Sequence, residues 1–143
     1  MTHSLEIREG GWETLGPEAT EIRRVVFIEE QNVPREEEWD GRDHDCIHFL
    51  ALLDDQPVGT ARLLPDAHIG RVAVLTEARG LGIGVALMRA AIDAARREGH
   101  RAVELAAQTH ALPFYSRLGF QAFGGEFMDA GIPHRNMRLS FTW

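Results

Sequence analysis

Apolar residues alternate with polar ones near both ends of the chain and form continuous runs in between. Near the N-terminus, Leu5 and Ile7 alternate with polar neighbours, which predicts a half-buried strand. The runs CIHFLALL and VGTARLL, joined by residues 54–57, predict an antiparallel hairpin. Further strands are predicted at IGRVAVL, AVELAA, FQAFGGEF and NMRLSFTW. The pattern therefore predicts a sheet of six to seven strands.

Three segments between these strands have the periodicity of helices. GPEATEIRRVVFIEEQ places Gly16 and Pro17 at a helix start, with acidic residues in the first turn. Residues 84–98 carry apolar side chains on one face and charged ones on the other, and Gly99 suits the C-terminal cap. HALPFYSRLG predicts a short third helix. This order predicts an α/β chain of mixed α+β character, with helices on both faces of a mixed sheet.

Length and composition limit the class of protein. With 143 residues, the chain is expected to form a single domain over residues 1–143. The net charge of −7 argues against nucleic acid as a partner. No segment has the pattern of a signal peptide or a membrane span, so we expect a cytoplasmic protein without membrane contact. Cys46 is the only cysteine, which excludes an intramolecular disulfide and a zinc site of paired cysteines, and no metal site is predicted.

The stretch RGLGIG, residues 79–84, lies between the strand IGRVAVL and an amphipathic helix. The glycines Gly80, Gly82 and Gly84 let backbone N–H groups converge without Cβ obstruction, and the helix N-terminus adds a positive dipole end. Arg79 adds a permanent positive charge and a forked donor that matches phosphate oxygens. This combination predicts a phosphate-binding turn.

Two kinds of phosphate ligand fit such a turn. A dinucleotide-binding fold has the pattern Gly-x-Gly-x-x-Gly after an early strand, with an acid about twenty residues further on. Glu104 stands twenty residues after Gly84, but the third glycine of that pattern would fall at Val85. A hairpin also precedes the motif where parallel crossovers are expected. The dinucleotide interpretation is therefore the weaker alternative.

The stretches RVAVLTEARGLGIGVALM and PFYSRLGF resemble the Gcn5-related N-acetyltransferases. The signature of that family is Arg/Gln-x-x-Gly-x-Gly/Ala after the fourth strand, and Arg79, Gly82 and Gly84 occupy its fixed positions. The resemblance extends from residue 4 to the end, and GIPHRNM is similar to a bacterial subgroup with mostly undefined substrates. It implies a largely antiparallel sheet whose fourth and fifth strands splay apart around a cleft.

The resemblance implies acetyl-CoA as the cosubstrate. Its pyrophosphate would lie on the turn from Arg79 to Gly84, and its pantetheine would run along the fourth strand at Val72 to Val74. A backbone N–H near Val74 would polarise the thioester carbonyl. Many family members have an asparagine after the fifth strand, where this chain has Gln108, whose amide is displaced by one methylene.

Acetyl transfer to an amine needs two proton movements, because an alkyl ammonium must lose a proton before it attacks and the departing thiolate gains one. Tyr115 stands where the family places the acid, although a tyrosine packed beside Phe114 is the structural alternative. Glu30 and His134 are the first candidates for the base, since their loops border the acceptor site in this family. The remaining candidates are Glu29, His48 and His110, and a water relay is favoured over direct contact.

The acceptor is expected to be a small-molecule amine or a protein amine. The stretch from Glu29 to Asp45 holds eight acids against only Arg35 and Arg42, so it is either a solvated loop or a negative wall of the cleft that favours cationic amines. The sequence is also compatible with a homodimer. The alternative to an enzyme is a non-catalytic CoA-binding sensor or interaction module.

Overall fold

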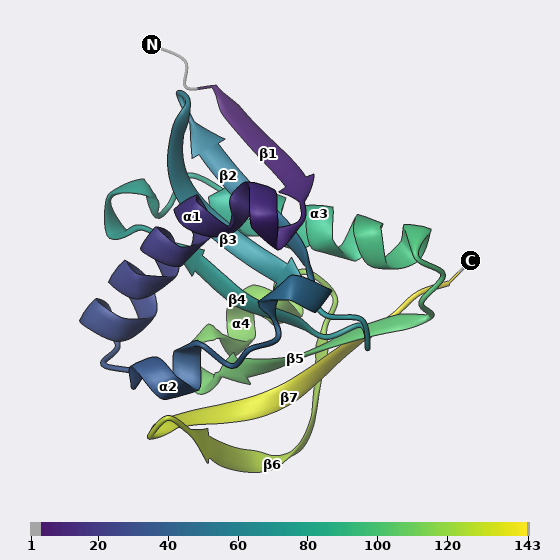
Figure 1. The fold of residues 1–143 in the computed structure, drawn as a ribbon. Helices are drawn as coiled ribbons and strands as arrows, with labels where there is room; N and C mark the ends of the chain where they lie inside the picture. The colour runs from purple at the N-terminus through teal and green to yellow at the C-terminus, as the bar shows by residue number, and fades with distance from the viewer. Residues whose placement is uncertain (1–3, 143) are drawn as a thin grey trace.

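The computed structural model describes residues 4–142, which form two antiparallel sheets (Figure 1). The first sheet has the strand order β1-β2-β3-β4, and the second has the order β5-β7-β6. The strands are β1 (Leu5–Gly10), β2 (Ile47–Leu53), β3 (Gln56–Leu63), β4 (Ile69–Val74), β5 (Ala102–Gln108), β6 (Gln121–Asp129) and β7 (Ile132–Ser140). The predicted hairpin is confirmed as β2–β3, and its turn residues Asp54 and Asp55 both have positive φ.

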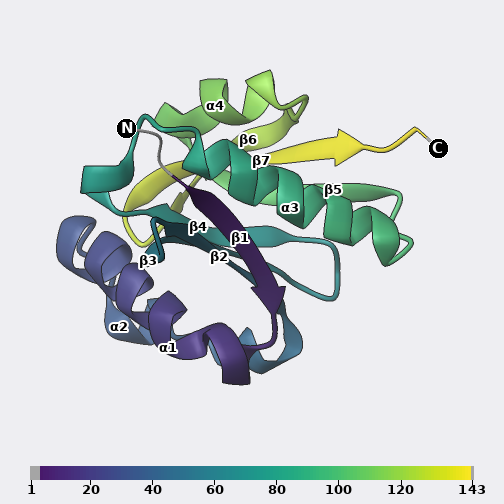
Figure 2. The same cartoon turned by 90° about the horizontal axis from the view of Figure 1, so that it is seen from above.

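Helices cover both faces of the strands, as the sequence predicted. In Figure 2, α1 and α2 lie on one side of the first sheet and α3 lies on the other. The helical segments are α1 (Trp12–Arg23), its π-helical continuation η1 (Arg24–Glu30), α2 (Arg35–Glu38), α3 (Ile83–Arg97) and α4 (Leu112–Arg117), with short 3-10 turns η2 (Asp43–Asp45), η3 (Thr76–Ala78) and η4 (Thr109–Ala111). None of the helices within residues 4–142 has the length and apolar character needed to cross a membrane.

Strand β2 is apolar apart from His48 because helices pack against both of its faces. Phe49 belongs to the core that includes Leu87 and Met88 of α3, whereas Leu50 packs into a second cluster with Leu15 and other residues of α1 and η1. A strand covered on both sides loses the polar alternation of a half-exposed strand. The continuous run CIHFLALL is the sequence signature of this burial.

Strands β4 and β5 separate soon after they meet. Within residues 4–142, the one bridge between the two sheets is the parallel pair His68↔Glu104, supported by the Glu104 N–H, which donates to the Ala67 carbonyl at 3.1 Å. Beyond it, the β5-facing edge of β4 has no strand partner among the described residues. The splayed pair is therefore confirmed. Since all pairs of named strands are antiparallel, the dinucleotide-binding alternative is wrong.

Two predicted boundaries are wrong. Helix α1 begins at Trp12 and contains Pro17, because the proline removes only its own N–H bond while Leu15 buries the earlier turn against the sheet. The last strand begins at Ile132, after the left-handed residues Ala130 and Gly131, so His134 lies within β7 and not in a loop before it.

Candidate active site

The glycine turn has the backbone geometry expected for an anion cradle. Gly80 and Gly82 both have left-handed φ angles, of 81° and 79°, and nothing lies within 4 Å of a Cβ built on either residue. Helix α3 begins directly after Gly82, without a side-chain cap and without an acid in its first turn, and its first intrahelical bond runs from the Ala86 N–H to the Gly82 carbonyl. The N–H groups of residues 83–85 therefore lack helical acceptors. The cradle fits a phosphate group.

Gly84, at the start of α3, packs against α4, the helix that contains Tyr115. A Cβ at Gly84 would lie 3.3 Å from the ring of Phe114 in α4, tighter than usual packing. The ring of Phe114 meets the edge of Tyr115 at a centroid distance of 5.0 Å. The third glycine thus allows α3 and α4 to approach closely.

Arg79 forms an ion pair with Glu30 on the opposite side of the turn. The Nη1 and Nη2 atoms of Arg79 donate to the Glu30 carboxylate at 2.9 and 2.8 Å, and Nε donates to the Val74 carbonyl at 3.0 Å. The bonds from Arg79, with a further one from Thr76, hold the pKa of Glu30 below its ordinary value. Two residues predicted for separate roles are therefore partners, and Glu30 is not among the residues that line the pocket between β4 and β5.

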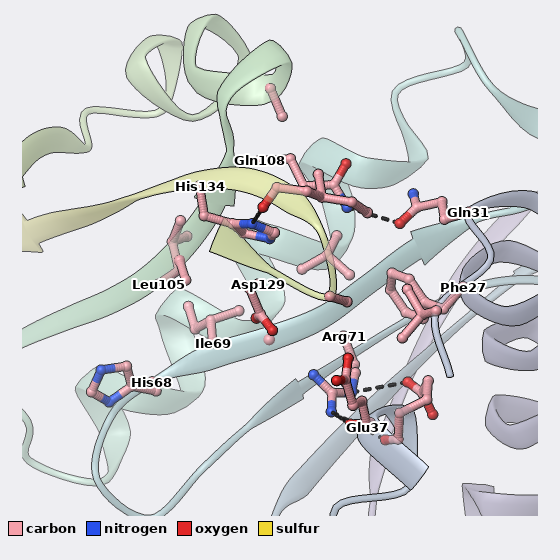
Figure 3. A pocket seen from close by; sticks show the side chains of 18 of the residues that line it. Phe27, Gln31, Glu37, His68, Ile69, Arg71, Leu105, Gln108, Asp129 and His134 are labelled. Carbon is pink, nitrogen blue, oxygen red and sulfur yellow. Dashed lines mark hydrogen bonds and ion pairs between the residues drawn. The ribbon is translucent and has the colours of Figure 1, made fainter. Parts of the chain in front are cut away.

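A pocket of about 540 Å³ occupies the space where β4 and β5 separate (Figure 3). Five of the candidate binding and catalytic residues selected from the sequence line it: Val72, Gln108, His110, Tyr115 and His134. The cradle residues and Val74 are not among its lining residues. The sequence-predicted residues therefore form two groups, one at the glycine turn and one in the pocket.

His134 presents one ring nitrogen to this pocket in a fixed tautomer. Its Nδ1 lies 2.7 Å from the Ile132 carbonyl, which can only accept a hydrogen bond, so Nδ1 carries the proton of the neutral ring. The ring stacks on Phe127 at 5.8 Å and is 9% exposed. Nε2 has no hydrogen-bond partner within residues 4–142. In this arrangement the Nε2 lone pair is available as a proton acceptor.

Tyr115 packs against two aromatic rings and also lines the same pocket. Phe114 and Phe120 meet its ring in edge-to-face contacts. Burial raises the pKa of Tyr115 to about 12, so the phenol keeps its proton at neutral pH. None of the residues from 4 to 142 hydrogen-bonds its hydroxyl group. The packing and acid interpretations are compatible, since the residue that packs against these rings also lines the pocket.

Gln108 bridges the pocket to the segment after η1. Its Nε2 donates to Oε1 of Gln31 at 2.8 Å (Figure 3). In the sheet, Gln108 is the direct partner of His134 on β7. Its amide therefore lies at the point where β5, β7 and the α1–α2 connection meet. The sequence offered no reason to select Gln31.

Most acids of the stretch from Glu29 to Asp45 are paired with arginines, so within residues 4–142 only Glu37 contributes an unpaired carboxylate from this stretch to the lining of the pocket. Arginines from other parts of the chain neutralise most of it, through the pairs Arg24–Glu29 (2.8 Å), Arg79–Glu30 (2.8 Å), Arg23–Glu38 (3.0 Å), Arg71–Glu38 (2.9 Å), Arg23–Asp43 (2.7 Å), Arg62–Asp43 (2.9 Å) and Arg62–Asp40. Glu38 and Asp43 are buried, and the Arg23 guanidinium also lies 4.9 Å from the Trp39 ring centroid. A count of charges within residues 29–45 does not include these arginines, because all of them lie outside that stretch.

Arg71 is a site residue that the sequence did not reveal. It lies in a bulge of β4 with a left-handed φ of 51°, a conformation that costs a residue with a Cβ about 1–3 kcal/mol. Its Nη2 donates to the carbonyls of Glu37 and Glu38 at 3.2 and 3.1 Å. Arg71 therefore fixes α2 against the strand that lines the pocket.

The other candidate bases lie in different environments. His110 lines the pocket, whereas Glu29 pairs with Arg24 away from it. His48 is buried under the ring of Trp12, and its Nε2 lies 2.8 Å from the Asp43 carbonyl. Burial lowers the pKa of His48, which keeps it neutral as a core residue.

Comparisons with known proteins agree with this geometry. The family model for the acetyltransferase (GNAT) domain matches residues 14–141. The chain is 39% identical over 120 residues to the uncharacterised N-acetyltransferase YjcF of Bacillus subtilis, covering 81% of this chain and 86% of that protein. An acyl-CoA N-acyltransferase structure from Pseudomonas aeruginosa shares 34% identity at a TM-score of 0.83, over 94% of this chain and 99% of that one. Escherichia coli ElaA shares 29% identity at a TM-score of 0.83, with the same coverage.

The chain belongs to the GNAT acetyltransferase family. It is an enzyme of the N-acetyltransferase class, in a family that takes acyl groups from acyl-CoA and acts on amine acceptors. The expectation of an enzyme is confirmed, and the non-catalytic alternative is not favoured.

Proposed function

We propose that this protein transfers an acetyl group from acetyl-CoA to a primary amine, by direct attack while both substrates are bound. The observation that supports it is one pocket, beside the unpaired edge of β4, that is lined by both His134, whose Nε2 has no partner within residues 4–142, and Tyr115, whose phenol is protonated at neutral pH. One side chain can accept a proton and the other can donate one, as amide formation from a thioester requires.

The glycine turn and the unpaired edge of β4 indicate which residues would bind acetyl-CoA. Backbone N–H groups around Gly80, Gly82 and Gly84 would bind the pyrophosphate, together with Arg79. The unpaired edge of β4 at Val72 and Val74 would bind the pantetheine as an added strand does. Acetyl-CoA supplies the acetyl group as a reactive thioester. Gln108 would bind the substrate or a water molecule through the second N–H and the carbonyl oxygen of its side-chain amide.

His134 removes the proton that keeps the amine from reacting. An alkyl ammonium with a pKa of about 10.4 is almost fully protonated at neutral pH, and its lone pair becomes available only when that proton leaves. Nε2 of His134 accepts it, directly or through water, while the Nδ1–H bond to the Ile132 carbonyl holds the ring in place. Glu30 is bound to Arg79, so we assign this role to His134 of the two first candidates.

Tyr115 supplies the second proton. As the nitrogen–carbon bond forms, the nitrogen loses its second proton, the carbon–sulfur bond breaks, and the sulfur takes the hydroxyl proton of Tyr115. The products are an N-acetylated amine and CoA as its thiol, with one proton released to solvent overall. The second proton from the nitrogen returns to the Tyr115 phenolate through solvent, and the raised pKa favours this reprotonation before the next turnover.

The test measures CoA thiol release and N-acetylated product together, for purified protein with acetyl-CoA and a panel of primary amines. We expect both in equal amounts, and we expect His134→Gln to lower kcat by about 10²–10⁴-fold with unchanged CoA affinity. His44→Gln, which changes an exposed histidine, is the matched control. Thiol release without an acetylated product, or a His134→Gln variant with full kcat, would overturn the proposal.

A further inference from the structure

The pocket retains two unpaired carboxylates. Four acids line it, but Glu38 is paired with Arg71 at 2.9 Å and Asp66 with Arg42 at 3.7 Å. The remaining acids, Glu37 and Asp129, have no hydrogen bond or ion pair to their carboxylates within residues 4–142. Glu37 and Asp129 therefore add two carboxylates without a protein partner in this part of the chain to the lining of the pocket.

These two carboxylates lie on different walls of the pocket. Glu37 belongs to α2, and the bond from Arg71 to its main-chain carbonyl, 3.2 Å long, fixes that backbone while leaving the side chain free. Asp129 ends β6 and pairs in register with Ile132, whose carbonyl holds the ring of His134. In Figure 3, Asp129 lies on the side of His134 and Glu37 lies near Arg71 on the other side.

A simple monoamine does not match this charge distribution. Such an acceptor enters with one positive charge and gives it up to the base before it attacks, so neither carboxylate has a lasting partner in the reactive state. The reacting end of the pocket is marked separately by the free Nε2 of His134, a side chain that is only 9% exposed. A second cationic group on the acceptor would stay charged throughout and would pair with the carboxylates.

We infer that the acceptor is a small alkyl diamine, or a similar amine with a second cationic group. This inference rests on the proposed acetyl transfer and narrows its substrate class. A pocket of about 540 Å³ has the size of small-ligand sites, which favours a free diamine over a lysine on a protein surface. Acetylation removes one of the two positive charges, so the product is held less strongly than the substrate.

The experiment compares kcat/KM for 1,4-diaminobutane and for n-butylamine, which differ by the second amine. We expect the protein to favour the diamine at least about tenfold at low salt, and less at about 0.5 M salt. Glu37→Gln and Asp129→Asn should each lower kcat/KM for the diamine by about three- to tenfold, mainly through KM, and leave butylamine within about twofold. Glu36→Gln, an exposed neighbour outside the pocket lining, should change neither substrate.

The possible outcomes distinguish the diamine inference from the acetyltransferase proposal. Acetylation of both amines with equal kcat/KM, or a preference for an amine that carries a carboxylate, would overturn the diamine inference and leave the acetyltransferase proposal intact. A basic peptide acetylated in preference to the diamine would also overturn it, in favour of a protein acceptor. Binding of acetyl-CoA without acetylation of any amine would overturn both.

Discussion

Arg79 and Glu30 form a two-point ion pair, with nitrogen–oxygen distances of 2.9 and 2.8 Å, between residues 49 positions apart in the chain. The pair connects the end of η1 to the glycine turn that precedes α3. An incoming pyrophosphate would therefore meet an arginine whose charge is already compensated. Glu30 is thus placed to tune cofactor binding through Arg79.

Glu30→Gln should strengthen CoA binding, because the Arg79 guanidinium would no longer be shared with a carboxylate. We expect the Kd of CoA to fall by about three- to tenfold, measured by calorimetry at low salt. Glu29→Gln, which changes the neighbouring Arg24 pair, is the control. Weaker binding would mean that Glu30 holds Arg79 in its productive position, and a collapse of kcat at saturating substrates would make Glu30 the base after all.

A negative charge introduced at Gly82 tests directly whether the glycine turn binds the phosphates of CoA. Gly82 has a φ of 79°, which asparagine and aspartate tolerate better than other residues with a Cβ. Gly82→Asp and Gly82→Asn differ only in charge, so the ratio of their CoA affinities isolates repulsion of the phosphates. We expect the aspartate variant to bind at least about tenfold more weakly than the asparagine variant. Equal affinities would move the pyrophosphate away from this turn.

Tyr115→Phe keeps the aromatic packing and removes only the hydroxyl proton. We expect kcat to fall by about 10²–10⁴-fold, with CoA affinity and thermal stability nearly unchanged. An acetyl aryl thioester, whose thiolate leaves without help from an acid, should restore much of the lost rate. Full kcat with acetyl-CoA would assign Tyr115 to packing alone.

Glu38→Gln should destabilise the fold strongly. Its side chain is 1% exposed and pairs with both Arg23 and Arg71, so the substitution leaves buried positive charge without compensation. Loss of one partner of a buried pair costs about 3–5 kcal/mol, measured here by urea unfolding. Glu36→Gln on the same helix is exposed and should stay within about 0.5 kcal/mol of the parent. Similar stabilities for the two variants would show that the arginine cluster is not structural.

Stability should fall as the pH is lowered below about 6.5. Burial lowers the pKa of His48, so between its ordinary value of about 6.5 and its folded value the unfolded chain binds more protons. The slope is at most about 1.4 kcal/mol per pH unit. The bond from Arg62 holds the pKa of Asp40 below its usual range, so its stabilisation is present above about pH 4 and is lost as the pH falls further.

His48→Gln tests this assignment, because glutamine can still donate to the Asp43 carbonyl. Melting temperatures of the variant should be flatter between about pH 6.5 and 5 than those of the parent, while both lose stability at lower pH. Parallel curves for the two proteins would place the titrating group elsewhere.

Local sequence determined the secondary-structure elements and the glycine turn before α3. The glycines before α3 specify left-handed backbone that few other residues adopt, and the alternation and runs of apolar residues specify which strands are covered on one or both faces. Tyr115 could be selected because its place in PFYSRLGF matches the position of the acid in the family that the sequence resembles. These features depend on neighbours within a few positions.

The charge partners were decided only by the tertiary structure. The stretch that reads as eight acids against two arginines is largely neutralised by arginines that arrive from α1, η1, β3, β4 and the glycine turn. The pairing of Glu30 with Arg79 and the meeting of Gln31 with Gln108 likewise join distant segments. An ion pair needs proximity of a few ångströms, and no periodicity along the chain encodes which distant residues come that close.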